Sequence, residues 1–298
     1  MKKPVTLYIL LLALSIGVLF LLNLFLGSVD IPFRSIWNIL WGMDEGESVI
    51  WQNIIWKSRV PQALTAMVAG AGLAVSGLQM QTVFRNPLAG PSVLGISSGA
   101  SLGVAFVVLL SGSIGGIALS RLGFMGEIAL TMAAIIGALS IMALIVYVSQ
   151  KVHGNVTLLI IGVMIGYVAN AVIGVLKFFS VEEDIRAYVI WGLGSFARVS
   201  GNQMMVFVCI MAVLLPLSFL LIKTLNLLLL GDAYARNLGL NIKRARLQVI
   251  ACSGVLVAIV TAYCGAIIFL GLAVPHLCRG IFWTYDHRTL MPAPLLAG

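Results

Sequence analysis

Long, unbroken stretches of apolar residues follow one another along this chain, separated by short polar connections. Within a stretch, apolar and polar residues do not alternate, so the pattern predicts helices and not the strands of a β-barrel. A helix needs about 20 apolar residues to cross the hydrocarbon core of a bilayer. We therefore expect an all-α fold, a polytopic bundle of membrane helices. The eight predicted spans cover residues 5–26, 61–82, 92–111, 126–149, 155–178, 204–228, 247–268 and 268–284.

The two ends of the chain also have the pattern of membrane segments. The first stretch is too long for the apolar part of a signal peptide and lacks a small-residue cleavage site, so we expect an uncleaved first span. A ninth span begins at Leu290, and the apolar ending LMPAPLLAG suggests that the chain is cut within it at Gly298. Residues 1–298 are thus predicted to form a single transmembrane domain.

Composition and charge agree with a membrane protein. Hydrophobic residues make up 61% of the chain and charged residues 9%, with a mean hydropathy of +1.09, whereas soluble domains carry about 25% charged residues. With the N-terminus in the cytoplasm, eleven of the 18 Lys and Arg residues lie on the inner side, as the positive-inside rule requires. The net charge of +8 therefore reflects topology. Because the basic residues are dispersed over short loops, nucleic-acid binding has no support.

The sequence contains no pattern typical of catalysis or of metal binding. Its four cysteines lie in apolar surroundings without a CxxC pair, and its three histidines lack the spacing of metal ligands. A Walker A motif is absent. We expect that the chain is not an enzyme, hydrolyses no ATP by itself, and holds no cofactor or metal.

Small residues recur every three or four positions in three of the predicted spans. Such stripes let helix backbones approach closely in a membrane, but they could also line a pathway for a solute. A polar residue within one stripe, Asn170, slightly favours a pathway, since a polar group at bilayer depth needs a partner or water. The stripes are Gly95, Gly99 and Gly103; Ala66, Gly70, Ala74 and Gly77; and Gly162, Gly166, Asn170 and Gly174.

Residues 229–248, LLGDAYARNLGLNIKRARLQ, form an elaborate connection on the predicted inner side. Asp232 is placed to cap a short helix, and Gly239 is placed to end it in a left-handed conformation. Basic residues follow at the membrane surface. Two interpretations remain open: this unit docks a cytoplasmic partner, or it is an interfacial helix without one.

At this point the chain resembles a known family, the FecCD-type permease subunits of ABC importers for iron–siderophores, haem and vitamin B12. The resemblance covers nearly the whole sequence. It implies ten spans with both termini inside, of which about eight and the start of a ninth are present here. The matching blocks, in order, are RVPQALTAMVAGAGLAVSGLQMQTVFRNPLAGPSVLGISSGASLG, YVIWGLGSF, LLGDAYARNLGLNIKRAR, GAIIFLGLAVPHLCRG and DHRTLMP.

The resemblance implies a permease subunit in the cytoplasmic (inner) membrane of a bacterium. Two permease subunits, identical or different, would form a central pathway. Two cytoplasmic ATPase subunits would bind and hydrolyse ATP, and an extracytoplasmic solute-binding protein would deliver the solute. We expect an iron–siderophore-like chelate, haem or cobalamin. The alternative is a secondary transporter driven by an ion gradient, which usually buries an ionisable group in mid-span; here the acids fall at boundaries or in loops.

The resemblance also implies roles for single residues. Arg59, and more weakly Lys57, would meet an acidic residue of the binding protein, although Arg59 could simply snorkel to the outer interface. The helix in VEEDIRAYVIWGLGSF would dip in from the outer face, although its acids and aromatics could also form an ordinary amphipathic loop. The ATPase-coupling candidates are Gly231, Asp232, Ala235, Leu238 and Gly239. The cytoplasmic-gate candidates are Arg85, Asn86, Pro87, Pro91, His153 and Asn155. The pathway-lining candidates are Gly162, Gly166, Asn170 and Gly174.

Overall fold

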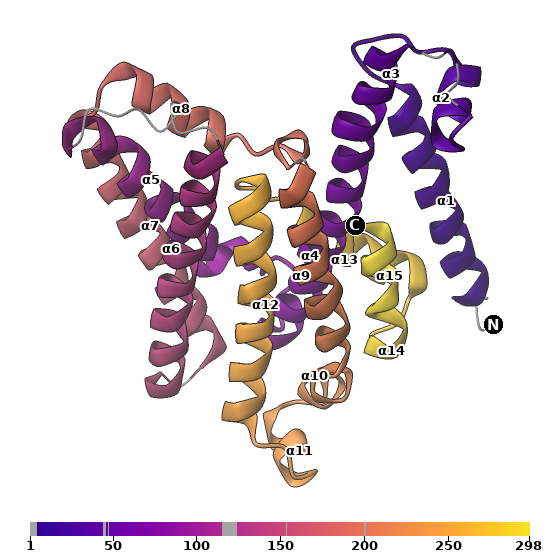
Figure 1. The fold of residues 1–298 in the computed structure, drawn as a ribbon. Helices are drawn as coiled ribbons and strands as arrows, with labels where there is room; N and C mark the ends of the chain where they lie inside the picture. Colours follow the sequence, from indigo (N-terminus) through magenta and orange to yellow (C-terminus); the bar gives the residue numbers. More distant parts are fainter. Residues whose placement is uncertain (1–4, 44–45, 47, 115–123, 153, 200) are drawn as a thin grey trace.

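The computed structural model describes the chain except for residues 1–4, 44–45, 47, 115–123, 153 and 200 (Figure 1). Its described residues form helices and short connections, without a strand among them. The predicted all-α class is therefore confirmed. The gate candidate His153 lies outside the described residues, as does the side chain of Asn155.

Eight long apolar helices correspond to the eight predicted spans. Six of the described helices are long and apolar enough to cross a membrane, and the apolar parts of α5 and α13 are shorter. The eight are α1 (Val5–Phe25), α4 (Val60–Phe84), α5 (Ile96–Ile114), α6 (Phe124–Lys151), α7 (Asn155–Phe178), α9 (Gly201–Phe219), α12 (Ile242–Cys264) and α13 (Leu270–Phe282).

The prediction of one span over residues 204–228 was wrong, because the structure has two helices there. Helix α9 ends at Phe219, and α10 (Ile222–Leu229) follows as a separate helix. Between them the amide of Leu220 donates to the carbonyl of Leu217, and the amide of Leu221 donates to that of Ser218, at 3.2 Å each. These are the bonds of a tight turn, and the hydropathy pattern missed the break because both halves are apolar.

Shorter helices lie at the two ends of the bundle (Figure 1). One end carries α2 (Phe33–Leu40), α3 (Val49–Ile54), a π-helical turn at Ile55–Arg59 that leads into α4, and α8 (Glu182–Gly192). The opposite end carries α11 (Asp232–Asn237), and we call it the α11 end. After α13 come α14 (His287–Leu290) and α15 (Pro292–Ala297).

Helix α4 forms the centre of the packing, because every residue from Ala69 to Phe84 is buried. Its neighbours include α9, α12, α13 and α15. The backbone of Gly271 in α13 comes so close to Gly77 that a side chain at Gly77 would collide with it. Gly70 is in similarly close contact with Gly298. In a membrane, where hydrophobic association is weak, this close backbone packing holds helices together.

The stripe at Gly95, Gly99 and Gly103 packs within the chain, but Gly95 is not part of its helix. Gly99 and Gly103 lie against Ala133 and Gly137 of α6. Gly95 instead ends a 3-10 turn, η2 (Pro91–Leu94), in a left-handed conformation with φ of +74°. The prediction that the three glycines share one helix was wrong, because glycine permits this turn at little cost.

We predict that Gly77→Leu destabilises the protein, because the added side chain would meet the backbone of Gly271, which cannot yield as a flexible side chain can. Overpacking of this kind costs about 1–3 kcal/mol or more. The control is Gly17→Ala in α1, where a Cβ meets nothing within 4 Å. Thermal unfolding in detergent should show a lower midpoint for Gly77→Leu alone. An unchanged midpoint for Gly77→Leu would show that the contact is not tight.

Candidate functional site

The predicted coupling unit is a short helix between two glycines with positive φ. Gly231 precedes α11 with φ of +101°, and Gly239 follows it with φ of +87°. The amide of Leu240 donates to the carbonyl of Ala235 at 3.0 Å and closes the helix end. The predicted left-handed conformation of Gly239 is thus confirmed. The predicted capping role of Asp232 was wrong, because Gly231 is the N-cap residue and the side chain of Asp232 makes no cap bond.

The carboxylate of Asp232 instead bridges two arginines. Its Oδ1 lies 2.7 Å from Nη2 of Arg85, and its Oδ2 lies 2.5 Å from Nη2 of Arg246. Arg85 ends α4 in a left-handed conformation and also donates to the carbonyl of Leu228 in α10 at 3.2 Å. Helices α4, α11 and α12 therefore meet at one carboxylate, and Arg85 links α10 to them. We call Arg85, Asp232 and Arg246 the Asp232 junction.

The junction positions helices more than it stabilises them. The side chains of Arg85 and Asp232 are each 42% exposed. Partly exposed pairs of this kind contribute about 0–1 kcal/mol each. Their bonds nevertheless fix the distance between the coupling unit and the end of the central helix.

The gate candidates at Arg85–Pro91 form a tight, irregular connection between α4 and α5. The side chain of Asn86 accepts a hydrogen bond from the amide of Leu88 at 2.9 Å. The amide of Asn86 in turn donates to the carbonyl of Gln81 at 3.2 Å. We call residues 85–91 the gate loop. Its irregular backbone lies at the α11 end, where the sequence predicted a break in the helix.

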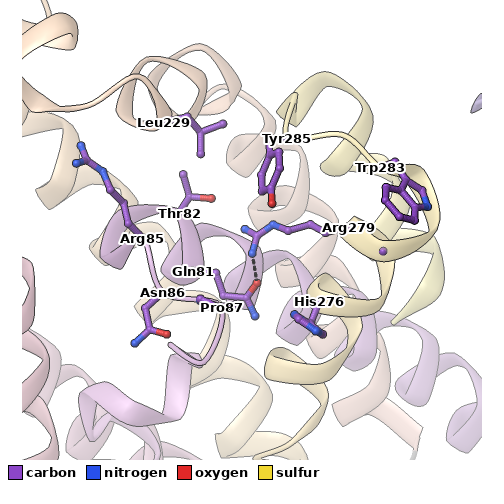
Figure 2. A pocket seen from close by; sticks show the side chains of 11 residues that line it. Gln81, Thr82, Arg85, Asn86, Pro87, Leu229, His276, Arg279, Trp283 and Tyr285 are labelled. Carbon is purple, nitrogen blue, oxygen red and sulfur yellow. Dashed lines mark hydrogen bonds between the residues drawn. The ribbon is translucent and has the colours of Figure 1, made fainter. Parts of the chain in front are cut away.

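A cavity of about 750 Å³ opens beside the gate loop (Figure 2). Arg85, Asn86 and Pro87 line it from the gate loop, and α4 contributes Gln81 and Thr82. The opposite wall comes from α13 and the residues after it. That wall carries His276, Arg279, Trp283 and Tyr285.

Two residues bond across this cavity that were not predicted from the sequence. Nη1 of Arg279 donates to Oε1 of Gln81 at 2.6 Å, and Nε2 of Gln81 donates to the carbonyl of Leu272 at 3.0 Å. Gln81 is 2% exposed. A glutamine and an arginine near the ends of apolar stretches were signals that could have pointed to this site, because buried polar groups need partners.

Next to the cavity, His287 joins three helices. Its side chain is fully buried, and Nε2 lies 2.8 Å from Oγ1 of Thr82 in α4. Nδ1 lies 2.8 Å from Oδ1 of Asn226 in α10. Since that amide oxygen can only accept, Nδ1 carries a proton. Burial, with Arg279 as a second cause, lowers the pKa of His287 to about 4.

At the opposite end, Arg59 is buried instead of reaching water. Its side chain is 5% exposed, and its guanidinium donates to the carbonyls of Leu24 at 2.5 Å, Phe25 at 3.3 Å and Val29. It thereby satisfies carbonyls at the end of α1. Lys57 is exposed. A contact of either residue with a binding protein stays a prediction, and Lys57 has the more accessible charge.

The pathway-lining candidates on α7 divide into two pairs. Gly162 lies against Leu94, and Gly166 lies near Gly95 and Ser98, so both pack within the chain. Asn170 is exposed, and a Cβ at Gly174 would meet nothing within 4 Å. The open face of α7 therefore carries Asn170 and Gly174. Gly162 and Gly166 instead agree with the interpretation that the stripe serves helix packing.

We predict that acid destabilises the protein through His287. A folded pKa of about 4 lies below the ordinary value of about 6.5, so the unfolded state takes up a proton first as the pH falls. Stability is therefore full above about pH 6.5 and is lost toward pH 4, by at most about 3 kcal/mol. Unfolding midpoints from pH 7.5 to 5 should fall more steeply in the wild type than in His287→Gln.

The matched control for that measurement is His276→Gln, because His276 is exposed. Its midpoints should keep the wild-type dependence on pH. Equal slopes for the wild type and His287→Gln would contradict the assignment.

Comparisons with known proteins agree with this architecture. The model of the FecCD transport family matches residues 12–298. The hemin transport system permease of Yersinia pestis is 36% identical over 274 residues, which cover 92% of this chain and 78% of that protein. The vitamin B12 import system permease of Klebsiella pneumoniae is 36% identical over 247 residues, which cover 83% of this chain and 71% of that protein.

A solved structure is similar over almost the whole fold. It is an inward-facing conformation of an ABC transporter assigned to the metal-chelate type, with a TM-score of 0.81 and 29% identity. The match covers 97% of this chain and 85% of that chain. On the family match, the sequence identity and the shared fold together, the chain belongs to the FecCD transport family.

Proposed function

We propose that this chain is the membrane-spanning permease subunit of an ABC importer that carries an iron chelate, haem or a related metal chelate into a bacterial cell. The observation that carries the proposal is the Asp232 junction, which ties an exposed helix–turn unit to the central helix α4. The relatives named above transport hemin and vitamin B12. Since the sequence has no Walker A motif, separate ATPase subunits would supply the energy and bind the ATP.

In this proposal, α11 is the surface on which a cytoplasmic ATPase subunit docks. Tyr234 and Leu238 expose 71% and 62% of their surfaces there, which supports a role in contact with a partner. A movement of α11 would pull on Asp232 and, through Arg85, on the end of α4. The α11 end and the N-terminus would then lie in the cytoplasm, in agreement with the distribution of basic residues.

The open face of α7 would meet a second permease subunit around the pathway. Besides Asn170 and Gly174, it exposes Tyr167 by 66% and Val168 by 65%. A polar side chain at bilayer depth needs water or a polar partner, and a pathway at a subunit interface supplies either. An extracytoplasmic solute-binding protein would dock at the opposite end of the bundle, where α2 and α8 lie. The chain itself would hold no cofactor.

A secondary transporter is the rival function, and the positions of the acids disfavour it. A coupling carboxylate would be expected near the middle of a span. Among the described membrane helices, the acid nearest to such a position is Glu127, in the first turn of α6. It accepts a hydrogen bond from Gln203 at 2.8 Å in an exposed place, which is typical of a helix end and not of a buried ion site.

We predict that uptake requires a partner ATPase and ATP. Proteoliposomes would contain the permease and its ATPase, with ATP in the lumen and chelate-loaded binding protein outside. Uptake of haemin should stop when the ATPase is omitted or when a non-hydrolysable ATP analogue replaces ATP. It should continue when an ionophore collapses the ion gradients. Gradient-driven uptake by the permease without the ATPase would overturn the proposal in favour of a secondary transporter.

A further inference from the structure

The cavity beside the gate loop has the chemistry of an anion-binding site (Figure 2). We propose that it receives the carboxylate groups of an acidic, conjugated chelate at the inner end of the pathway, with Arg279 as the group that binds them. The inference rests on the proposed function and narrows its substrate class, because it favours a chelate with free carboxylates over one without them.

Arg279 carries a positive charge on the wall of the cavity. Its guanidinium is partly buried, and Nη1 bonds to the neutral Gln81. Its Nε is buried without a hydrogen-bond acceptor. Within the described chain, no carboxylate forms an ion pair with it. A partly buried cation without a counter-charge is unfavourable, so an anion from outside the chain would complete the site.

Arg85, the arginine across the cavity, has a carboxylate partner. That carboxylate, Asp232, also binds Arg246, so its single negative charge is shared between two guanidinium groups. The described lining of the cavity contains neither Asp nor Glu. Among the described residues, Arg279 is therefore the lining arginine without a carboxylate partner, and its planar guanidinium suits a carboxylate. His276 stands one helical turn before it, exposed on the same wall.

The cavity has the size of a small-molecule site and an aromatic wall. A volume of about 750 Å³ falls within the range of about 300–1,000 Å³ that is typical of small-molecule sites. Trp283 and Tyr285 flank Arg279 in Figure 2 and expose 78% and 67% of their surfaces. Flat rings beside a guanidinium fit a ligand that combines a conjugated ring system with carboxylates.

The cavity lies directly beside the gate loop. Asn86 and Pro87 of the gate loop form part of its wall, so a chelate that passes the loop would enter it directly. Such a site has to bind weakly enough to release its ligand into the cytoplasm. The half-open surroundings of Arg279 agree with weak binding, because water screens the attraction.

The test measures binding without turnover. The permease and its ATPase subunits are placed together in nucleotide-free nanodiscs and titrated at low salt with haemin, which carries two carboxylates, and with its dimethyl ester, which carries none. Arg279→Gln should weaken haemin binding by about tenfold, which corresponds to about 1.4 kcal/mol. It should leave binding of the ester unchanged. Arg279→Lys should retain part of the haemin affinity, because it keeps the charge.

The matched control is Arg186→Gln, an exposed arginine of α8 at the opposite end of the bundle, which should bind haemin as the wild type does. Equal haemin affinity for the wild type and Arg279→Gln would overturn the inference. An equal loss for haemin and its ester would also overturn it, because Arg279 would then act on the shape of the cavity. Loss of the ATPase subunits from Arg279→Gln would assign Arg279 to the ATPase contact instead.

Failure of this test is distinguishable from failure of the proposed function. ATP-driven uptake into proteoliposomes does not require Arg279 to bind a carboxylate. Continued ATP-driven uptake together with unaltered haemin binding in Arg279→Gln would reject the anion site and keep the importer. Uptake that needs no ATPase would reject the importer whatever the binding data show.

Discussion

The ion pair between Arg85 and Asp232 is the interaction through which a movement of α11 would reach the central helix α4. It joins residues 147 positions apart in the sequence, one at the end of the buried central helix and one at the start of α11. Helix α4 is packed by direct backbone contact at Gly77, and close-packed interiors transmit displacement instead of absorbing it. A movement at Asp232 would therefore shift α4 and the gate loop together.

The buried and partly buried arginines of this protein have different roles because they have different partners. Arg59 is buried, and backbone carbonyls at the end of α1 satisfy it, so its charge mainly holds two segments together. Arg85 and Arg246 share Asp232 and position helices. Arg279 lines a cavity and bonds to the neutral Gln81, and no described carboxylate forms an ion pair with it. Arginine thus packs two segments together at one position, links helices at others and, in our proposal, binds a ligand at a third place. The partners that the fold supplies decide which.

Local features were the ones that could be predicted from the sequence. Apolar runs located the spans, and Gly239 marked the end of α11 because a positive φ there favours glycine. The break between α9 and α10 could not be predicted, since both sides are apolar. The partners of Asp232, Arg59 and Gln81 were hidden for another reason. They lie on other segments, and the packing of α1, α4, α11, α12 and α13 brings them together.

The central claim is that the Asp232 junction transmits movement between the ATPase and α4. The most direct test is a double-mutant cycle with Asp232→Asn and Arg85→Gln, with chelate uptake per ATP hydrolysed as the readout. We expect each single variant to retain its ATPase subunits and to transport less chelate per ATP. The double variant should be no worse than either single variant, because coupled residues are not additive. Full uptake per ATP in Asp232→Asn, or strictly additive losses, would contradict the account.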